Sequence, residues 1–224
     1  MKLEINFNKL ENFCKENDFI LIDDEKLKSE NMYKNFVYST TNNFVGKAVY
    51  PENMPIIINK DVCDKLTKMN NELKLKGKSI TIYDAYRPIQ IQKLFWDFFY
   101  DVHGYHDETL VANPDKYGTH NIKINAIDMF ITNIDGSYLE LPCEFDDFTE
   151  KANIYYDRCS KESIKNRDLL IDTAKKYGLI VSENEWWHFV DKRIFNQGKI
   201  CNYLESNLIP TGQEKVFILQ NNEG

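Results

Sequence analysis

Two short stretches of the sequence contain side chains that could bind a metal ion and transfer a proton. The chain has four histidines, of which His120 lies in THNIKINAIDMF and His188 ends EWWH. Hydrolytic zinc sites hold the metal with three protein side chains and keep a fourth position for water. His120, Asp128 and His188 form the best such set in this chain. Glu185 could take a proton from that water and pass it to a leaving amine, so the indicated chemistry is metal-assisted hydrolysis.

Each of these residues also has a purely structural interpretation. Asp128 lies in the apolar run INAIDMF, where an ionised carboxylate is costly unless it is paired or bound to a metal. A strand-end aspartate that accepts backbone hydrogen bonds would also explain it. His120, in a glycine-containing loop, is typical of a solvated side chain. Positions three apart in a strand point to opposite faces, so Glu185 and His188 converge only if a turn or bulge precedes His188, which we expect at ENE.

The hydrophobic pattern predicts the elements that must position these side chains. Helical spacing of apolar residues predicts helices over 6–17, 61–76, 89–102 and 161–177. Alternating or continuous apolar runs predict strands over 18–25, 78–86 and 124–132, and a strand or strand pair over 179–191. Residues 103–123 are expected to form a loop, in which we interpret His103 and His106 as solvated side chains and not as a second metal site. Because helices and strands alternate without a strict β-α-β rhythm, the expected fold is α+β, a mainly antiparallel sheet with flanking helices.

Composition and charge limit the possible classes of protein. A chain of 224 residues with 42% hydrophobic content can bury one sizeable core, so we expect a single domain over residues 1–224. The net charge of -7 argues against a nucleic-acid or anionic-membrane partner. No stretch is apolar enough for a signal-peptide core or a membrane span, which predicts a cytoplasmic protein. Its five widely spaced cysteines are expected to be reduced.

Four stretches follow one another along the chain: YSTTNNFVGKAVY (38–50), YDAYRP (83–88), THNIKINAIDMF (119–130) and EWWH (185–188). Together they resemble the D-alanyl-D-alanine dipeptidase family associated with vancomycin resistance. The members of this family are zinc metallopeptidases related in fold to zinc D,D-carboxypeptidases and to the hedgehog signalling domain, and the resemblance implies that fold here. The similarity runs from about residue 33 to about residue 190, so residues 1–30 and 200–224 are expected to be peripheral segments.

The resemblance implies one zinc ion per chain, bound by His120, Asp128 and His188, with Glu185 as the catalytic base. Arg87 in YDAYRP would stabilise the oxyanion of the tetrahedral intermediate, a role that suits a guanidinium because it stays charged. The implied substrate is D-alanyl-D-alanine or a similar small D,D-dipeptide, whose free amino terminus could pair with an aspartate of the pocket. The residues implied to bind this substrate are Tyr38, Gly118, Thr119 and Asp146, of which Asp146 is that aspartate.

The sequence departs from the family pattern at the first metal-binding motif. In the family motif, Ser-x-His-x-x-Gly-x-Ala-x-Asp, the two ligands are seven positions apart, whereas His120 and Asp128 are eight apart. An extra residue can be absorbed as a bulge or in the loop before the strand. Gly118 stands where the family has a serine that helps to hold the substrate amino group, and Thr119 could supply the missing hydroxyl. Two other functions therefore stay open: a D,D- or L,D-carboxypeptidase acting on peptidoglycan fragments, and a non-catalytic homologue that binds a small peptide.

Overall fold

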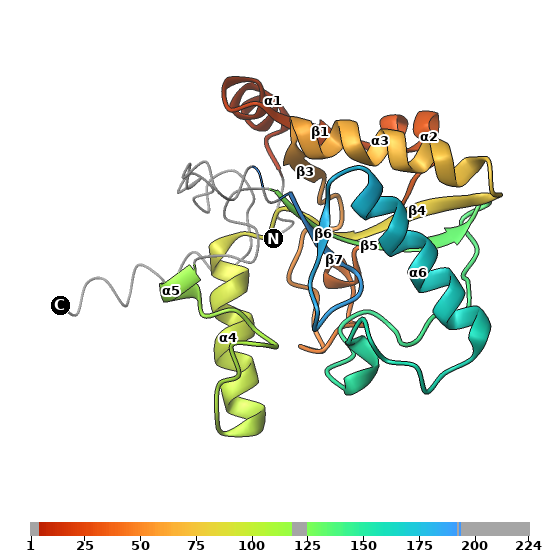
Figure 1. Cartoon of the computed structure of the whole chain (residues 1–224). Helices are drawn as coiled ribbons and strands as arrows, with labels where there is room; N and C mark the ends of the chain where they lie inside the picture. Colours follow the sequence, from red (N-terminus) through yellow and green to blue (C-terminus); the bar gives the residue numbers. More distant parts are fainter. Residues whose placement is uncertain (1–4, 118–124, 192, 194–224) are drawn as a thin grey trace, which may run out of the picture.

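A five-stranded sheet lies at the centre of the computed structural model, which describes residues 5–117, 125–191 and 193 (Figure 1). The strands lie in the order β2-β4-β5-β7-β6, and of the pairs in these residues only β2 with β4 is parallel. Their bounds are Tyr33–Lys34 (β2), Lys78–Asp84 (β4), Ala126–Asn133 (β5), Ile180–Val181 (β6) and His188–Val190 (β7). Strands β1 (Phe19–Ile22) and β3 (Ile56–Asn59) form a separate antiparallel pair. The predicted α+β fold with a mainly antiparallel sheet is confirmed.

Two long helices cover one face of the sheet. α3 (Lys60–Lys74) contacts β4, α6 (Lys161–Lys176) contacts β5, and the two helices also contact each other (Figure 1). Each begins at a side-chain cap, because Asn59 accepts a hydrogen bond from the backbone of Asp61 and Ser160 accepts one from the backbone of Ser163. The other helices of the described residues are α1 (Phe7–Glu16), α2 (Asp24–Glu30), α4 (Ile89–His103), α5 (Pro114–Tyr117) and two short 3-10 turns, Val37–Ser39 and Glu150–Ala152.

The four predicted helices are found with their ends shifted by one or two residues, and residues 179–191 form the antiparallel pair β6 and β7. The prediction of a strand over 18–25 is wrong at its end. Strand β1 stops at Ile22 because the Asp23 side chain accepts a hydrogen bond from the Lys26 backbone (2.8 Å) and so starts α2. Helix α5 lies within the stretch predicted to be a loop. That the whole chain is one domain stays a prediction.

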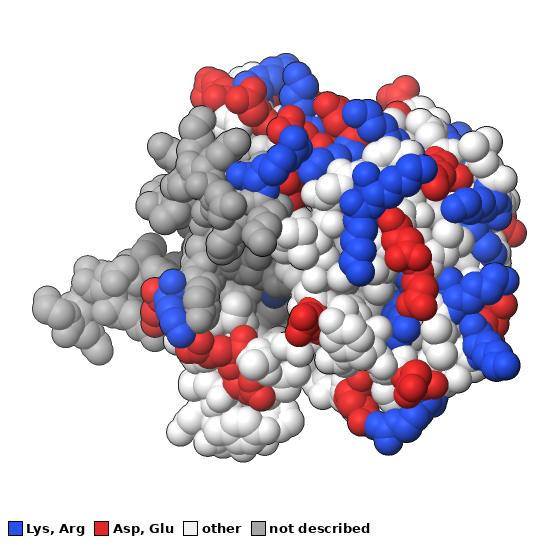
Figure 2. Space-filling view, viewed as in Figure 1, with Lys and Arg blue, Asp and Glu red and all other residues white. Residues whose placement is uncertain are grey.

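Charged side chains of both signs are mixed on the surface. On the face seen in Figure 2, the basic and acidic residues of the described chain are interspersed over α3 and α6 and do not form an extended basic area. Among residues 5–117, 125–191 and 193, no helix combines the length and the apolar character that crossing a membrane would need.

Candidate active site

Asp128 and His188 lie opposite each other on the adjacent strands β5 and β7. His188 Nδ1 is 2.8 Å from Asp128 Oδ1, and both side chains are largely buried. Burial lowers the pKa of His188, but the hydrogen bond to Asp128 and the negative charges nearby outweigh this effect and raise the pKa overall. Nitrogen and oxygen ligands of a tetrahedral zinc ion lie roughly 3.3 Å apart, so the two atoms need to separate only slightly to share a metal ion. The structure therefore brings together two of the three predicted metal ligands.

Glu185 reaches the same place through a turn at the start of β7. The backbone N–H of His188 donates to the Glu185 carbonyl (3.0 Å), which closes a four-residue turn over EWWH. The predicted turn before His188 is confirmed, although it falls on EWWH and not on ENE. Burial raises the pKa of the Glu185 carboxyl, against the opposing effect of the neighbouring His188. A carboxyl group that holds its proton more tightly than usual thus lies beside the two candidate ligands.

The two tryptophans of EWWH hold this turn in place. Trp186 and Trp187 are 0% and 1% exposed, and their ring centres lie 4.5 and 6.1 Å from that of Phe130 in β5. The backbone N–H of Trp186 also donates to the Ala152 carbonyl (2.9 Å). Two kinds of contact therefore fix the turn. The tryptophan rings pack against the sheet, and the Trp186 backbone is hydrogen-bonded to the segment that precedes α6.

A β-bulge in β4 brings another buried carboxylate, Asp84, next to Asp128. The register pairs Ile82 with Met129 and then Asp84 with Asp128, so Tyr83 is the extra residue of the bulge. Burial raises the pKa of Asp84 to about 6. Sequence reasoning missed Asp84, and the one available signal was an aspartate at the end of an otherwise apolar strand.

Arg87 follows this strand and is held between the sheet and α4. Its Nε and Nη2 atoms lie 3.0 and 2.8 Å from Oδ2 of Asp84, and its Nη1 donates to Gln92 Oε1 (2.9 Å). Its guanidinium carbon lies 5.0 Å from the ring centre of Phe95 and 5.5 Å from that of Tyr38. Burial lowers the pKa of Arg87, but Asp84 and the neighbouring Tyr38, Tyr50 and Asp128 together more than compensate and raise it well above its ordinary value. The side chain is therefore a permanently charged donor at a fixed place.

Tyr38 and Asp146, two predicted substrate-binding residues, are in direct contact. Tyr38 Oη donates to Asp146 Oδ2 at 2.6 Å. The backbone of Asp146 has a φ of 59°, in the left-handed region that residues other than glycine seldom adopt. Burial raises the pKa of Asp146 to about 8, although the Tyr38 hydrogen bond and the charge of Arg87 lower it.

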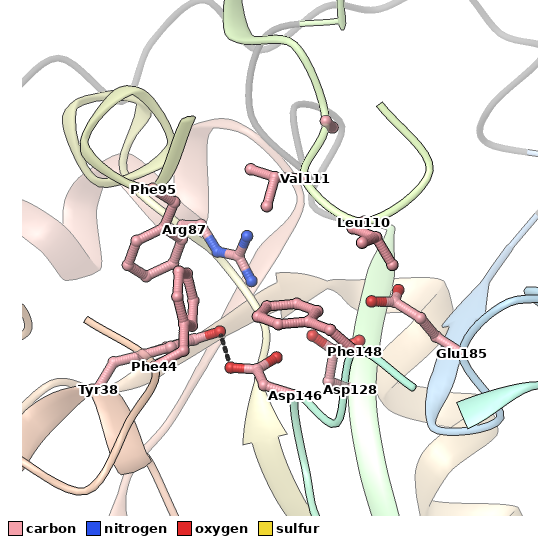
Figure 3. A pocket seen from close by; sticks show the side chains of 11 residues that line it. Tyr38, Phe44, Arg87, Phe95, Leu110, Val111, Asp128, Asp146, Phe148 and Glu185 are labelled. Atoms are coloured by element: carbon pink, nitrogen blue, oxygen red, sulfur yellow. Dashed lines mark hydrogen bonds between the residues drawn. The ribbon is translucent and has the colours of Figure 1, made fainter. Parts of the chain in front are cut away.

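Four of the charged side chains described above line one pocket (Figure 3). The space inside it, counted with its open mouth, is about 350 Å³. Its charged groups come from Arg87, Asp128, Asp146 and Glu185. Sequence reasoning missed its apolar walls, which are formed by Phe44, Phe95, Leu110, Val111, Ala112 and Phe148 together with the predicted Tyr38. The remaining predicted site residues, Gly118, Thr119 and His120, lie outside the described residues.

Comparison with known proteins relates the chain to peptidases. Residues 29–203 match the family model described as D-ala-D-ala dipeptidase. The chain is 31% identical, over 152 residues, to a D-alanyl-D-alanine dipeptidase of Escherichia coli. This match covers 68% of the chain and 75% of the relative.

Two solved structures show a partial likeness. The vancomycin-resistance D,D-pentapeptidase VanY, solved as a mutant in complex with Zn(II), has a TM-score of 0.40 and 17% identity, over 66% of this chain and 84% of its own. The LD-carboxypeptidase LdcB has a TM-score of 0.41 and 20% identity, over 68% of this chain and 70% of its own. The relation to a family comes from the two sequence matches and not from these structures.

The carboxyl group of Asp146 should titrate near pH 8 in the metal-free protein, because burial disfavours its charged form. Since this pKa lies above the unfolded value, the contribution of Asp146 to the free energy of unfolding is present at low pH and declines from about pH 4 to about pH 8. Carboxyl-carbon NMR, with Asp146→Asn to assign the signal, measures the pKa. Tyr38→Phe should raise it further, because the substitution removes a hydrogen bond to the ionised form. A wild-type pKa near 4 would show that this environment is wrong.

Proposed function

Because the chain belongs to the D-alanyl-D-alanine dipeptidase family of peptidases, we propose that it hydrolyses D-alanyl-D-alanine or a similar small D,D-dipeptide with one zinc ion per chain. The observation that carries this proposal is the convergence of Asp128, Glu185 and Arg87 on one pocket (Figure 3), with His188 hydrogen-bonded to Asp128 at 2.8 Å. A pair of metal-binding side chains, a carboxyl group beside them and a buried guanidinium are the groups that metal-assisted peptide hydrolysis requires.

The donor set suits a zinc ion as far as the described residues extend. Asp128 Oδ1 and His188 Nδ1, 2.8 Å apart, are an oxygen and a nitrogen ligand of the kind that zinc accepts. Within residues 5–117, 125–191 and 193, no group of three or more His, Cys, Asp or Glu side chains is arranged to hold a metal ion. We propose His120, which lies outside those residues, as the third ligand because it corresponds to the histidine of the family motif. The chemistry that the ion would supply is polarisation of the peptide carbonyl and acidification of water.

Glu185 would act first as a base and then as an acid. It lies on the turn that ends at His188. In the proposed site its carboxyl group lies next to the metal ligands and does not itself bind the metal. Burial raises its pKa, which brings the group closer to the pH at which one carboxyl can both accept and return a proton. Glu185 would take a proton from the attacking water and deliver it to the amine that leaves.

Arg87 would stabilise the negative charge that develops on the carbonyl oxygen of the substrate. Its side chain is buried, lines the pocket and is held by Asp84, so the donor is in place before the charge appears. A pre-placed charged donor in a site with little water is more effective than a mobile one, because no reorganisation is needed during the reaction.

Asp146 would bind the free amino terminus of the dipeptide. Tyr38 holds one carboxylate oxygen of Asp146, which orients the group in the pocket. An ammonium group beside Asp146 would favour its ionised form and lower its raised pKa, so binding would be coupled to loss of a proton. Thr119 is proposed to supply a hydroxyl to the same amino group, with Gly118 leaving room for it. This arrangement favours a free dipeptide over an N-acylated peptidoglycan fragment.

The wild-type protein is expected to bind one zinc ion, measured by titration against a competing chelator. His120→Ala, Asp128→Ala and His188→Ala should each weaken zinc binding by at least about 100-fold, because each removes a direct ligand. Glu185→Gln should retain the metal. Unchanged zinc affinity in the His120 variant would reject the assignment of the third ligand, and unchanged affinity in all three would reject the site.

Glu185→Gln should lower kcat about 100- to 10,000-fold while zinc stays bound, because the amide cannot take a proton from water. The matched control is Glu183→Gln, an exposed glutamate two positions earlier, which should keep wild-type activity. Release of D-alanine from D-alanyl-D-alanine is the measurement. If Glu185→Gln turns over at the wild-type rate, Glu185 is not the base.

The free amino terminus should be required for efficient cleavage. D-alanyl-D-alanine is expected to be cleaved with a kcat/KM at least about 100-fold above that of its N-acetyl derivative, since the latter leaves the half-buried Asp146 without a cationic partner. Asp146→Asn should raise KM for the free dipeptide and narrow this difference. Preference for the N-acetyl compound would instead favour the carboxypeptidase function. No turnover of either compound by the zinc-loaded wild type would favour a non-catalytic binding protein.

A further inference from the structure

We propose that Gln92 is a positioning residue that fixes the plane of the Arg87 guanidinium and connects it to the 110–112 wall of the pocket. This inference rests on the proposed function insofar as Arg87 acts on the reacting carbonyl. Gln92 itself does not line the pocket, so it would act only through Arg87 and Ala112.

Both ends of the Gln92 amide are used. The side chain lies on the first turns of α4 and is 0% exposed. Its Oε1 accepts from Arg87 Nη1 at 2.9 Å, and its Nε2 donates to the Ala112 carbonyl at 2.8 Å. Buried polar groups need such partners, because a buried donor or acceptor without one costs about 1–3 kcal/mol. Gln92 therefore satisfies a charged donor on one side and a backbone carbonyl on the other.

The bond from Gln92 adds a restraint that Asp84 does not provide. The Nε and Nη2 atoms of Arg87 both approach the same oxygen, Oδ2 of Asp84. Two contacts to one atom resist a pivot of the guanidinium plane about that atom less firmly than a bidentate pair, in which two oxygens fix the plane. A third contact at Nη1, on the other side of the group, opposes that pivot.

Helix α4 delivers this restraint together with an aromatic support. Gln92 and Phe95 are three positions apart, so both side chains lie on one face of the helix. The guanidinium carbon of Arg87 lies 5.0 Å from the centre of the Phe95 ring. The sheet thus holds Arg87 through Asp84, and the helix holds it through Gln92 and Phe95.

The other end of the Gln92 amide holds one wall of the pocket. Leu110, Val111 and Ala112 line the pocket, and the backbone N–H groups of Leu110 and Val111 donate to the Asp107 carbonyl. Figure 3 shows Val111 above the Arg87 guanidinium and Leu110 beside Glu185. Because Gln92 bonds to Ala112 and to Arg87 at once, it sets the distance between this wall and the guanidinium.

An amide is the side-chain group that meets both requirements in one plane. Gln92→Met keeps the length and approximate volume of the side chain but provides neither hydrogen bond. Gln92→Glu keeps the acceptor for Arg87 and loses the donor to Ala112. The chain also offers a matched control, Gln90, which lies on the same turn of α4, is 8% exposed, does not line the pocket, and has an Oε1 without a hydrogen-bond partner among the described residues.

The test compares zinc-loaded wild type, Gln92→Met, Gln92→Glu and Gln90→Met with D-alanyl-D-alanine as substrate. Gln92→Met should lower kcat about 10- to 100-fold with KM changed less than about threefold, because Arg87 acts on charge that develops only in the transition state. Gln92→Glu should keep a kcat well above that of Gln92→Met. The glutamate variant also serves as the test if the methionine variant does not fold. Gln90→Met should stay within about twofold of wild type. Equal kinetics for the Gln92 and Gln90 methionine variants would overturn the inference while leaving the proposed function intact.

A crystal structure of Gln92→Met separates the inference from the proposed function. The guanidinium of Arg87 should rotate away from its wild-type plane in this variant and keep that plane in Gln90→Met. An inactive wild type would reject the proposed function, and the rotation would still establish that Gln92 positions Arg87. An unmoved Arg87 in Gln92→Met would reject the inference whatever the activity.

Discussion

The burial of several carboxyl groups around one guanidinium is the constraint on which the site depends. Asp84, Asp128, Asp146 and Glu185 are all drawn together near Arg87. Removing an ionised carboxylate from water is costly unless it is paired, and the cost is visible as a raised pKa at three of these groups. The Arg87 guanidinium, even together with a protonated His188, cannot balance four ionised carboxylates. A divalent cation at Asp128 and an ammonium group at Asp146 would both reduce this deficit, so the electrostatics favour the metal and the substrate that we propose.

The convergence of these groups depends on irregularities at the ends of two strands, β4 and β7. The bulge at Tyr83 places Asp84 opposite Asp128, and the turn over EWWH brings Glu185 back to the start of β7. Arg87 lies in the short connection between β4 and α4, where Pro88 precedes the first helical residue. Regular strands would have sent these side chains to different faces. The regular part of the sheet, with α3 and α6 packed on its other face, is what holds the irregular ends in place.

The sequence predicted correctly the features that depend on residues close to one another in the chain. The turn before His188 followed from the strand period, and the burial of Asp128 followed from its apolar neighbours. Asp84 and Gln92 were missed because a bulge leaves no trace in the alternation of apolar residues and because Ala112 is twenty positions from Gln92. The walls of the pocket were missed for the same reason, since Phe44 and Phe148 meet only in the folded chain. Helix α2, with seven residues, is too short to show a helical period.

The register of the sheet limits where the extra residue between His120 and Asp128 can lie. Ala126, Ile127 and Asp128 pair in order with residues of β7, so none of them can be the extra residue. Asn125 is also fixed, because its carbonyl accepts from the Asp191 backbone and its side chain donates to the Asp191 carbonyl. The extra residue relative to the family motif therefore falls within residues 121–124, which lie outside the described residues. The longer interval leaves the observed pairing of Asp128 with His188 unchanged, so the departure from the family motif is compatible with the proposed metal site.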